Sequence, residues 1–181
     1  MASISAIESD YLSQLTPADA ASDGERYLGC HLEPDLTVAL AVQKITEVLT
    51  IPTSQVTPIP HMSPWVMGVY NWRGEVLWMM DLGHLFGLTP WYQQTHYRSA
   101  HPVLVARTWS STSSNQESVK IGLVVSQVQD IEVLSSNAMQ APSPAIASPE
   151  IAPFLQGYWL RKNGDLLACV DVDAVFSMIA K

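Results

Sequence analysis

The residue types that could perform chemistry are present in this 181-residue chain, but not at spacings typical of an enzyme. There is no HExxH or CxxC pair, no GxxxxGK[ST] or GxGxxG phosphate-binding loop, and no GxSxG nucleophile elbow. The five histidines follow no recognisable zinc spacing and stand at His31, His61, His84, His96 and His101. We therefore expect no catalytic residue, no metal and no cofactor.

Two aspartates, Asp81 and Asp171, could be imagined as paired carboxylates. Each stands instead where a helix start needs an acceptor for its free N–H groups, and a capping bond is worth about 1 kcal/mol. Capping is the better account, and Asp173 could take the place of Asp171. We expect two short helices, each closing one end of a small barrel, with buried side chains at Leu82, Leu85 and Phe86 in the first and Val172, Val175 and Phe176 in the second.

Aromatic side chains gather around one predicted hairpin, where Trp65, Trp72 and Trp78 lie close in sequence. Large aromatics there more often fill small-barrel cores or anchor protein contacts than stack on ligands. A small β-barrel ligand-binding module or enzyme that uses Trp65 and Trp78 is the alternative hypothesis.

Short runs of Val, Leu, Ile and aromatics, separated by Gly, Pro, Asn and Ser, predict an all-β core. Two segments share one plan, an apolar pair of runs around a turn followed by an aspartate and a short helix: residues 67–87 and 157–176. The second has Asn163-Gly164 between its runs, the strongest signal for a type I′ turn with positive φ at both residues. The repetition predicts two similar subdomains.

Composition sets limits on class and partners. With 48% apolar residues the chain can build a real core, and its net charge of −8, with Lys and Arg scattered, argues against nucleic acid. No apolar run reaches the roughly 20 residues that span a bilayer, so we expect a cytoplasmic protein without direct membrane insertion. Cys30 and Cys169 are expected to be buried free thiols. Residues 1–25 are expected to form an acidic leader, either flexible or one short helix, before a domain over residues 26–181.

The segment from Met67 to Gly87 resembles the signature of the CheW family, the coupling proteins of bacterial chemosensory arrays. Two further blocks resemble the family's, at residues 39–52 and 122–131, and residues 157–176 resemble its closing hairpin. Three positions depart from the usual family residues, because Trp78 replaces a proline, Trp72 a leucine and Ser126 an aspartate. The matches within the signature are Gly68, Asn71, Arg73, Gly74, Asp81, Leu82 and Leu85.

The resemblance implies two SH3-like five-stranded β-barrels and a non-catalytic adaptor. It would bind the cytoplasmic tip of a methyl-accepting chemoreceptor and the regulatory domain of a CheA-type histidine kinase, and so be recruited to membrane-associated receptor arrays. Such a protein would serve chemotaxis, phototaxis or type IV pilus motility.

The resemblance also implies site residues. Arg73, with Asn71 and Gly74, is the candidate for signal coupling and kinase contact, although from physics alone an arginine at a hairpin tip could be solvated or could tether the turn. The candidates for the receptor-binding groove are Ile45, Glu47, Val48, Val124 and Val125, of which the last two could equally be ordinary strand core.

Overall fold

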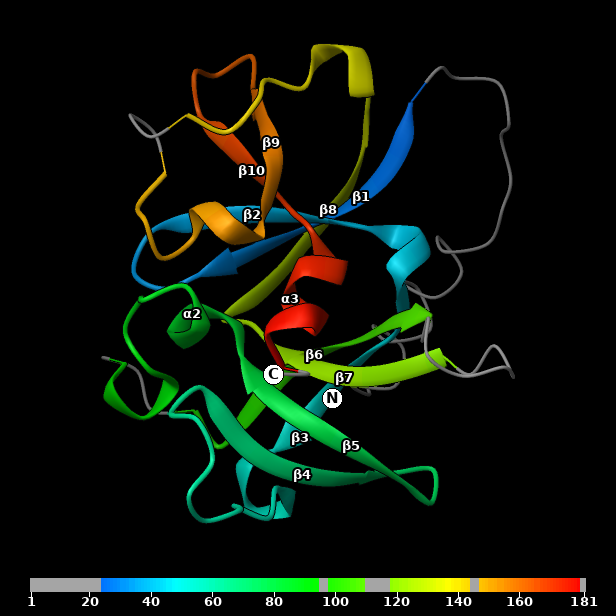
Figure 1. The fold of residues 1–181 in the computed structure, drawn as a ribbon, viewed down its shortest axis with the longest axis vertical. Helices are drawn as coiled ribbons and strands as arrows, with labels where there is room; N and C mark the ends of the chain where they lie inside the picture. Colours follow the sequence, from blue (N-terminus) through cyan, green and yellow to red (C-terminus); the bar gives the residue numbers. More distant parts are fainter. Residues whose placement is uncertain (1–23, 95–97, 110–117, 144–146, 180–181) are drawn as a thin grey trace, which may run out of the picture.

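The structure, a computed structural model, describes residues 24–94, 98–109, 118–143 and 147–179 and contains two five-stranded sheets (Figure 1). Barrel 1 has the strand order β8 (Gln127–Leu134), β1 (Glu25–Leu32), β2 (Leu36–Ala41), β10 (Leu166–Val170) and β9 (Leu155–Leu160). Barrel 2 has the order β3 (Ile45–Pro52), β6 (Ala100–Trp109), β7 (Ser118–Val124), β5 (Glu75–Asp81) and β4 (Val66–Trp72). The predicted all-β class is confirmed.

Both barrels are built on one plan. In each barrel one pair of neighbouring strands is parallel, β2 with β10 in barrel 1 and β7 with β5 in barrel 2. The strands β10 and β5 are each the second strand of a hairpin. β10 leads into helix α3 (Val172–Ile179), and β5 leads into helix α2 (Leu82–Leu85). Barrel 2 runs without interruption from β3 to β7, whereas barrel 1 takes strands from both ends of the described chain. The predicted pair of similar subdomains is therefore present, with the chain crossing from one to the other twice.

Short 3-10 helices occupy several connections. None of the helices in the described ranges is long and apolar enough to cross a bilayer. The 3-10 helices are η1 (Val42–Lys44), η2 (Thr53–Gln55), η3 (Trp91–Gln93), η4 (Ser136–Ala138) and η5 (Ala152–Phe154).

Strand alternation sorts apolar side chains between each barrel's interior and the seam between the barrels. On β6, Val103 and Val105 fill barrel 2, while Leu104 and Ala106 join the large core that both barrels share. Barrel 1 has a smaller interior around Tyr27 and Trp159, whose rings meet edge to face. Because successive residues of a strand face opposite sides, one strand serves two cores.

Two glycines mark equivalent places in the repeated hairpins. A Cβ on Gly68 would lie 2.2 Å from the Thr57 carbonyl oxygen, and one on Gly157 would lie 2.4 Å from the Gln140 carbonyl oxygen. In each case the next residue pairs with that same outer segment, in the bridges Thr57↔Val69 and Gln140↔Tyr158. Glycine is needed because another backbone crosses there.

Both predicted caps are confirmed. The Asp81 carboxylate accepts a hydrogen bond from the His84 N–H (3.1 Å), and that of Asp171 accepts from the N–H groups of Asp173 and Ala174. Asp171 rather than Asp173 is thus the second cap. All six side chains predicted to be buried by these helices are buried.

The type I′ expectation at Asn163-Gly164 is wrong. Gly164 has φ of 91°, but Asn163 does not have a positive φ, and its side chain accepts from the Asp165 N–H within a five-residue connection. Two consecutive residues with positive φ occur instead in the β4–β5 turn, at Arg73 (φ 55°) and Gly74 (φ 85°). The Asn71 side chain accepts from the Gly74 N–H (2.9 Å), which fixes that two-residue turn.

The expectation of buried free thiols is confirmed, because Cys30 and Cys169 are both buried and unpaired. Most of the predicted acidic leader, residues 1–23, lies outside the described residues, and β1 begins at Glu25.

Candidate functional site

Arg73 lies at the tip of the β4–β5 hairpin, and its side chain is 70% exposed. Its Nη2 donates to the Glu47 carboxylate at 2.8 Å, and its guanidinium carbon lies 5.1 Å from the centre of the Trp72 ring. Lys120 Nζ also lies over that ring, at 4.8 Å. The arginine is therefore neither freely solvated nor buried, because a carboxylate and an aromatic face hold it at the surface.

Glu47 connects the two edge strands of barrel 2. Its Oε2 accepts from Trp72 Nε1 at 3.0 Å while its Oε1 accepts from Arg73. Glu47 belongs to β3 and Trp72 to β4, which stand at opposite ends of the strand order. The Trp72 ring itself is 7% exposed and packs in the barrel interior. Glu47 and Arg73, predicted as site residues from two different sequence blocks, thus meet in one contact together with Trp72, and Glu47 takes part in closing the barrel.

Barrel 1 carries a comparable ion pair between Arg161, at the start of the β9–β10 connection, and Glu132 on its edge strand β8. In both barrels an arginine of the hairpin therefore pairs with a glutamate of the first strand that follows the passage from the other barrel, β3 or β8.

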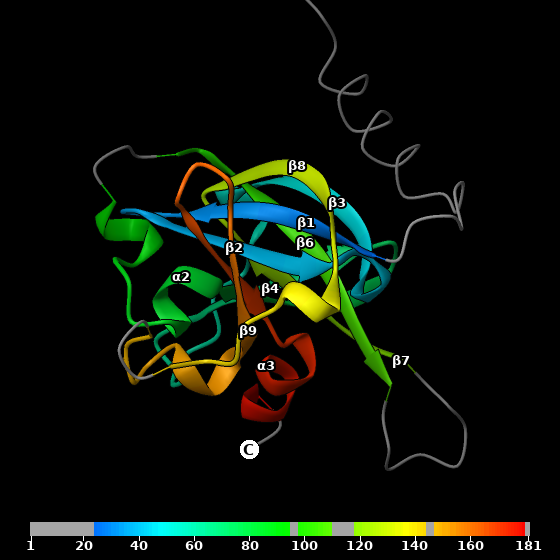
Figure 2. The same ribbon diagram turned by 90° about the horizontal axis from the view of Figure 1, so that it is seen from above.

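Each of these two strands, β3 and β8, contains a β-bulge. Pairing shifts register between Ile45 and Glu47 on β3, and on β8 two residues oppose Gly29 of β1. As a result, residues three apart in sequence, Ile45 and Val48 on β3, both pack on the shared core, and so do Val128 and Ile131 on β8. Figure 2 shows β3 and β8 on the side of the molecule away from α3. We call Ile45, Val48, Val128 and Ile131 the β3–β8 face.

The five predicted groove residues do not form one surface. Val48 is half-buried and Ile45 is 6% exposed, while Glu47 points to Trp72 and the hairpin tip. Val124 and Val125 are each 3% exposed, and as neighbours they face different cores, Val124 the interior of barrel 2 and Val125 the seam. These two valines can support a surface from beneath but offer none of their own.

Sequence reasoning missed Val128 and Ile131 as candidates. Both lie in the block of residues 122–131 that resembles the family, but a spacing of three does not put two side chains on the same face of a regular strand. Only the bulge opposite Gly29 places them together, and a bulge leaves no distinctive signal in a single sequence.

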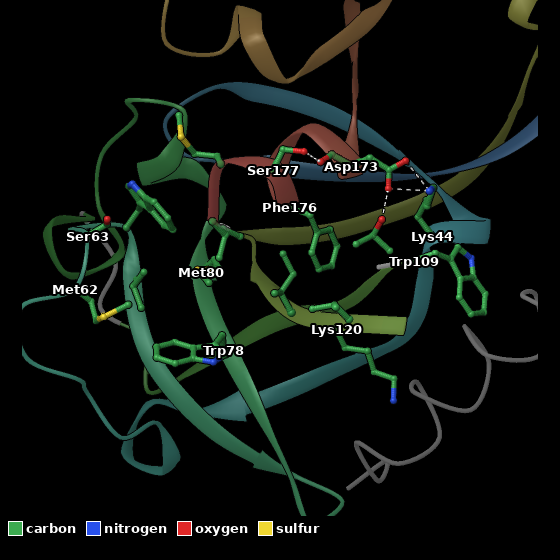
Figure 3. A pocket seen from close by; sticks show the side chains of 17 residues that line it. Lys44, Met62, Ser63, Trp78, Met80, Trp109, Lys120, Asp173, Phe176 and Ser177 are labelled. Atoms are coloured by element: carbon green, nitrogen blue, oxygen red, sulfur yellow. Dashed lines mark hydrogen bonds and ion pairs between the residues drawn. The ribbon is translucent and has the colours of Figure 1, made fainter. Parts of the chain in front are cut away.

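On the other side of the seam, a groove of about 920 Å³ separates helix α3 from β5 and β7 (Figure 3). Trp78, Met62 and Phe176 of α3 line it in Figure 3. Trp65 lines it too, so the two tryptophans of the alternative hypothesis share one cavity. At one end Asp173 accepts from Lys44 Nζ (2.7 Å) and from Thr108 Oγ1 (2.6 Å). Burial acts to raise the pKa of Asp173, but these two hydrogen bonds and the positive charge of Lys44 together outweigh it and lower that pKa. We call this cavity the α3 groove.

A small polar cluster lies beside helix α2. The Asp81 carboxylate, 3% exposed, accepts from the Trp91 N–H (2.8 Å) as well as capping the helix. The His101 ring, 4% exposed, meets the Trp91 ring edge to face, and its Nε2 has no partner. Burial lowers the pKa of His101. Within the described ranges, no three His, Cys, Asp or Glu side chains converge as metal ligands would.

The chain is similar in sequence and in fold to known proteins. A family model described as the CheW-like domain matches residues 26–180. A chemotaxis protein CheW of Rhizobium meliloti is 32% identical over 120 residues, covering 66% of this chain and 68% of that protein. One of Thermotoga maritima is 23% identical over 141 residues, covering 78% and 82%. The solved scaffolding protein TtCheW from Thermoanaerobacter tengcongensis shares the fold, with a TM-score of 0.64 at 17% identity over 82% of this chain and 90% of that one.

Proposed function

The chain belongs to the CheW-like domain family, and on that premise we propose that it is a non-catalytic adaptor coupling a methyl-accepting chemoreceptor to a CheA-type histidine kinase. It binds the receptor's cytoplasmic tip and the kinase regulatory domain from the cytoplasm, in chemotaxis, phototaxis or type IV pilus motility.

The β3–β8 face is the observation that carries the receptor-binding part of the proposal. Val48, Val128 and Ile131 are half-buried, and all three rest on the core shared by the barrels. A receptor tip is a helical hairpin with an apolar stripe, and a strip of branched side chains backed by rigid core suits such a stripe. Ile45 and Val125 belong to the same shared core beneath it, so their part is to hold the strip in place, whereas Val124 packs in the interior of barrel 2.

The tip of the β4–β5 hairpin is the proposed kinase contact. Arg73 is exposed there, and Val76 nearby on β5 is 69% exposed, an apolar residue that partner contact would cover. The fixed turn at Asn71 and Gly74 presents the arginine in one orientation.

Glu47 connects the two proposed surfaces. Its backbone lies between Ile45 and Val48 on β3, while its carboxylate holds both Trp72 and Arg73. A displacement of β3 by a bound receptor would therefore shift the partner of Arg73. Coupling in this proposal is a change in the position or freedom of one arginine at the kinase contact.

The experiment measures binding of the purified chain to a receptor-tip fragment and, separately, to a kinase regulatory domain from the same organism. Val48→Asp and Ile131→Asp place a charge on the β3–β8 face, and we expect each to weaken receptor binding at least tenfold while kinase binding persists. Val133→Asp is the matched control, because Val133 is 56% exposed on the same strand β8 but outside the face. Equal loss with the control, or no wild-type binding to either partner, would contradict the proposal.

A further inference from the structure

Ser126 lies where the chain passes from barrel 2 to barrel 1, between the end of β7 and the start of β8. It is 5% exposed, and all three of its polar groups make hydrogen bonds. Its N–H donates to the His31 carbonyl oxygen (3.0 Å), its Oγ accepts from the Glu33 N–H (2.9 Å), and its carbonyl oxygen accepts from Arg98. The first two bonds tie Ser126 to the end of β1 and the residue after it, which belong to barrel 1, whereas the third comes from a segment of barrel 2.

The backbone of Arg98 is held by barrel 2. Arg98 precedes β6 by two residues. The carbonyl oxygens of Arg98 and Ser99 accept hydrogen bonds from the Oγ1 and the N–H of Thr53, at 3.4 and 2.9 Å. Thr53 directly follows β3. The arginine is therefore anchored at the end of β3, one of the two strands that form the β3–β8 face.

The guanidinium of Arg98 extends to the other strand of that face. Its Nη1 donates to the carbonyl oxygen of Ser126, directly before β8, and its Nη2 donates to the Glu33 carboxylate at 3.2 Å. The side chains of Arg98 and Glu33 are 36% and 19% exposed, so water reaches this ion pair only in part. Hydrogen bonds from a charged donor are stronger than those between neutral groups. One side chain thus links the end of β3 in barrel 2 to the start of β8 in barrel 1.

The β3–β8 face depends on how the two barrels are aligned, because each barrel supplies two of its four residues. Val128, one of these residues, is two positions beyond Ser126. The proposed kinase contact has no such dependence, because it lies within the β4–β5 hairpin of barrel 2. A change in the alignment of the barrels would therefore disturb the face and leave the kinase contact intact.

We propose that Arg98 is a positioning residue for the receptor contact, because it aligns β3 and β8 across the seam. Its role in receptor binding rests on the function proposed above. Without the arginine the barrels still share their large core, so the chain folds, but the two strands can take more than one relative position. Only the fraction of molecules with the binding alignment then binds, and the apparent dissociation constant rises in inverse proportion to that fraction.

The distance between spin labels on the two strands tests the alignment without any partner. Thr50→Cys on β3 and Asp130→Cys on β8 supply labelling sites at exposed positions. The native Cys30 and Cys169 are buried and should stay unlabelled. We expect Arg98→Ala to widen the distribution of distances that double electron–electron resonance measures between the two labels.

Binding to a receptor-tip fragment and to a kinase regulatory domain tests the role of this alignment. Arg98→Ala should raise the dissociation constant for the receptor tip about fivefold, as when about one molecule in five has the binding alignment. The dissociation constant for the kinase domain should stay the same.

Arg107→Ala is the matched control for both measurements. It removes the same side chain from the other end of β6, where the arginine is exposed and its bond to the Gln43 carbonyl oxygen is 3.4 Å long. This variant should match the wild type in the label distances and in both affinities.

Four results are informative in different ways. The same distance distribution in Arg98→Ala as in the wild type would overturn the proposal, whatever the partners do. A wider distribution with unchanged receptor affinity would overturn the role in binding. Equal losses of receptor and kinase affinity would also overturn it, because they indicate a general loss of structure. A wild-type chain that binds neither partner would contradict the proposed function instead, and the label distances would still decide whether Arg98 aligns the strands.

Discussion

An ion pair of 2.8 Å between Arg73 and Glu47 joins the tip of the β4–β5 hairpin to β3, the first strand after the chain passes from barrel 1 to barrel 2. The carboxylate is 13% exposed and the guanidinium 70%, so the pair lies half in and half out of the molecule. Such a pair contributes little to stability, in the range of about 0.2 to 1 kcal/mol for exposed ion pairs. We propose that this pair, placed between two proposed binding surfaces, serves signal transfer rather than stability.

Arg73→Gly separates these two roles. Glycine tolerates the φ of 55° at this position, and loss of the ion pair costs little, so we expect the melting temperature to change by less than about 4 °C. Kinase activation in reconstituted receptor arrays should fall severalfold. A larger melting loss with normal activation would show that the arginine mainly props the hairpin.

Gly157→Ala should be among the most damaging single-methyl additions. The new Cβ would lie 2.4 Å from a backbone oxygen of Gln140, so one strand must move, and we expect a loss of about 3 kcal/mol in the free energy of unfolding measured with urea. Gly74→Ala is the control, because its φ is 85° but nothing lies within 4 Å, and it should lose only about 1 kcal/mol. Similar losses in both variants would mean that the crossing at Gln140 adjusts freely.

His101 predicts a pH dependence of stability. Burial, with a smaller contribution from Arg98 and against the opposing effect of Asp81, lowers its pKa below the ordinary 6.5. The unfolded chain therefore binds a proton at a higher pH than the folded chain does. The free energy of unfolding should fall as pH decreases from about 7 and level off below the folded pKa.

Denaturant titrations between pH 5 and pH 8 would measure this slope. His101→Phe, which keeps a ring beside Trp91, should flatten it. An unaltered slope in His101→Phe would assign the pH dependence to other groups.

The two cysteines should be unreactive in the folded protein. Burial raises the pKa of Cys169 to about 12 and raises that of Cys30 as well, so neither forms a thiolate near neutral pH. Titration with a thiol-reactive dye at pH 8 should label no site in buffer and two sites in denaturant. Rapid labelling of the native protein would contradict the burial of these strands.

The local rules of the sequence predicted much of the fold. The repeated hairpin and the caps at Asp81 and Asp171 are short-range features that composition and spacing reveal. The turn at Asn163 was mispredicted because the connection there is five residues long, so the two-residue geometry that favours Asn-Gly does not arise.

The candidate site was less predictable, since it depends on register and long-range convergence. The bulge between Ile45 and Glu47 determines which residues of β3 face the seam, and no local sequence pattern predicts that bulge. Val124 and Val125 have side chains suited to a binding strip, yet each lies in a hydrophobic core and is 3% exposed. The α3 groove combines residues from several elements that meet only after the barrels assemble.

The order of strands has a consequence during synthesis on the ribosome. β1 and β2 emerge first, but the partners that complete their sheet, β8, β9 and β10, emerge only after all of barrel 2. Barrel 2 holds all five of its strands in one stretch, so it can close first and offer its seam side as the template for barrel 1. Until then the β1–β2 hairpin has unpaired edges, which makes the nascent N-terminal hairpin the part most in need of protection from aggregation.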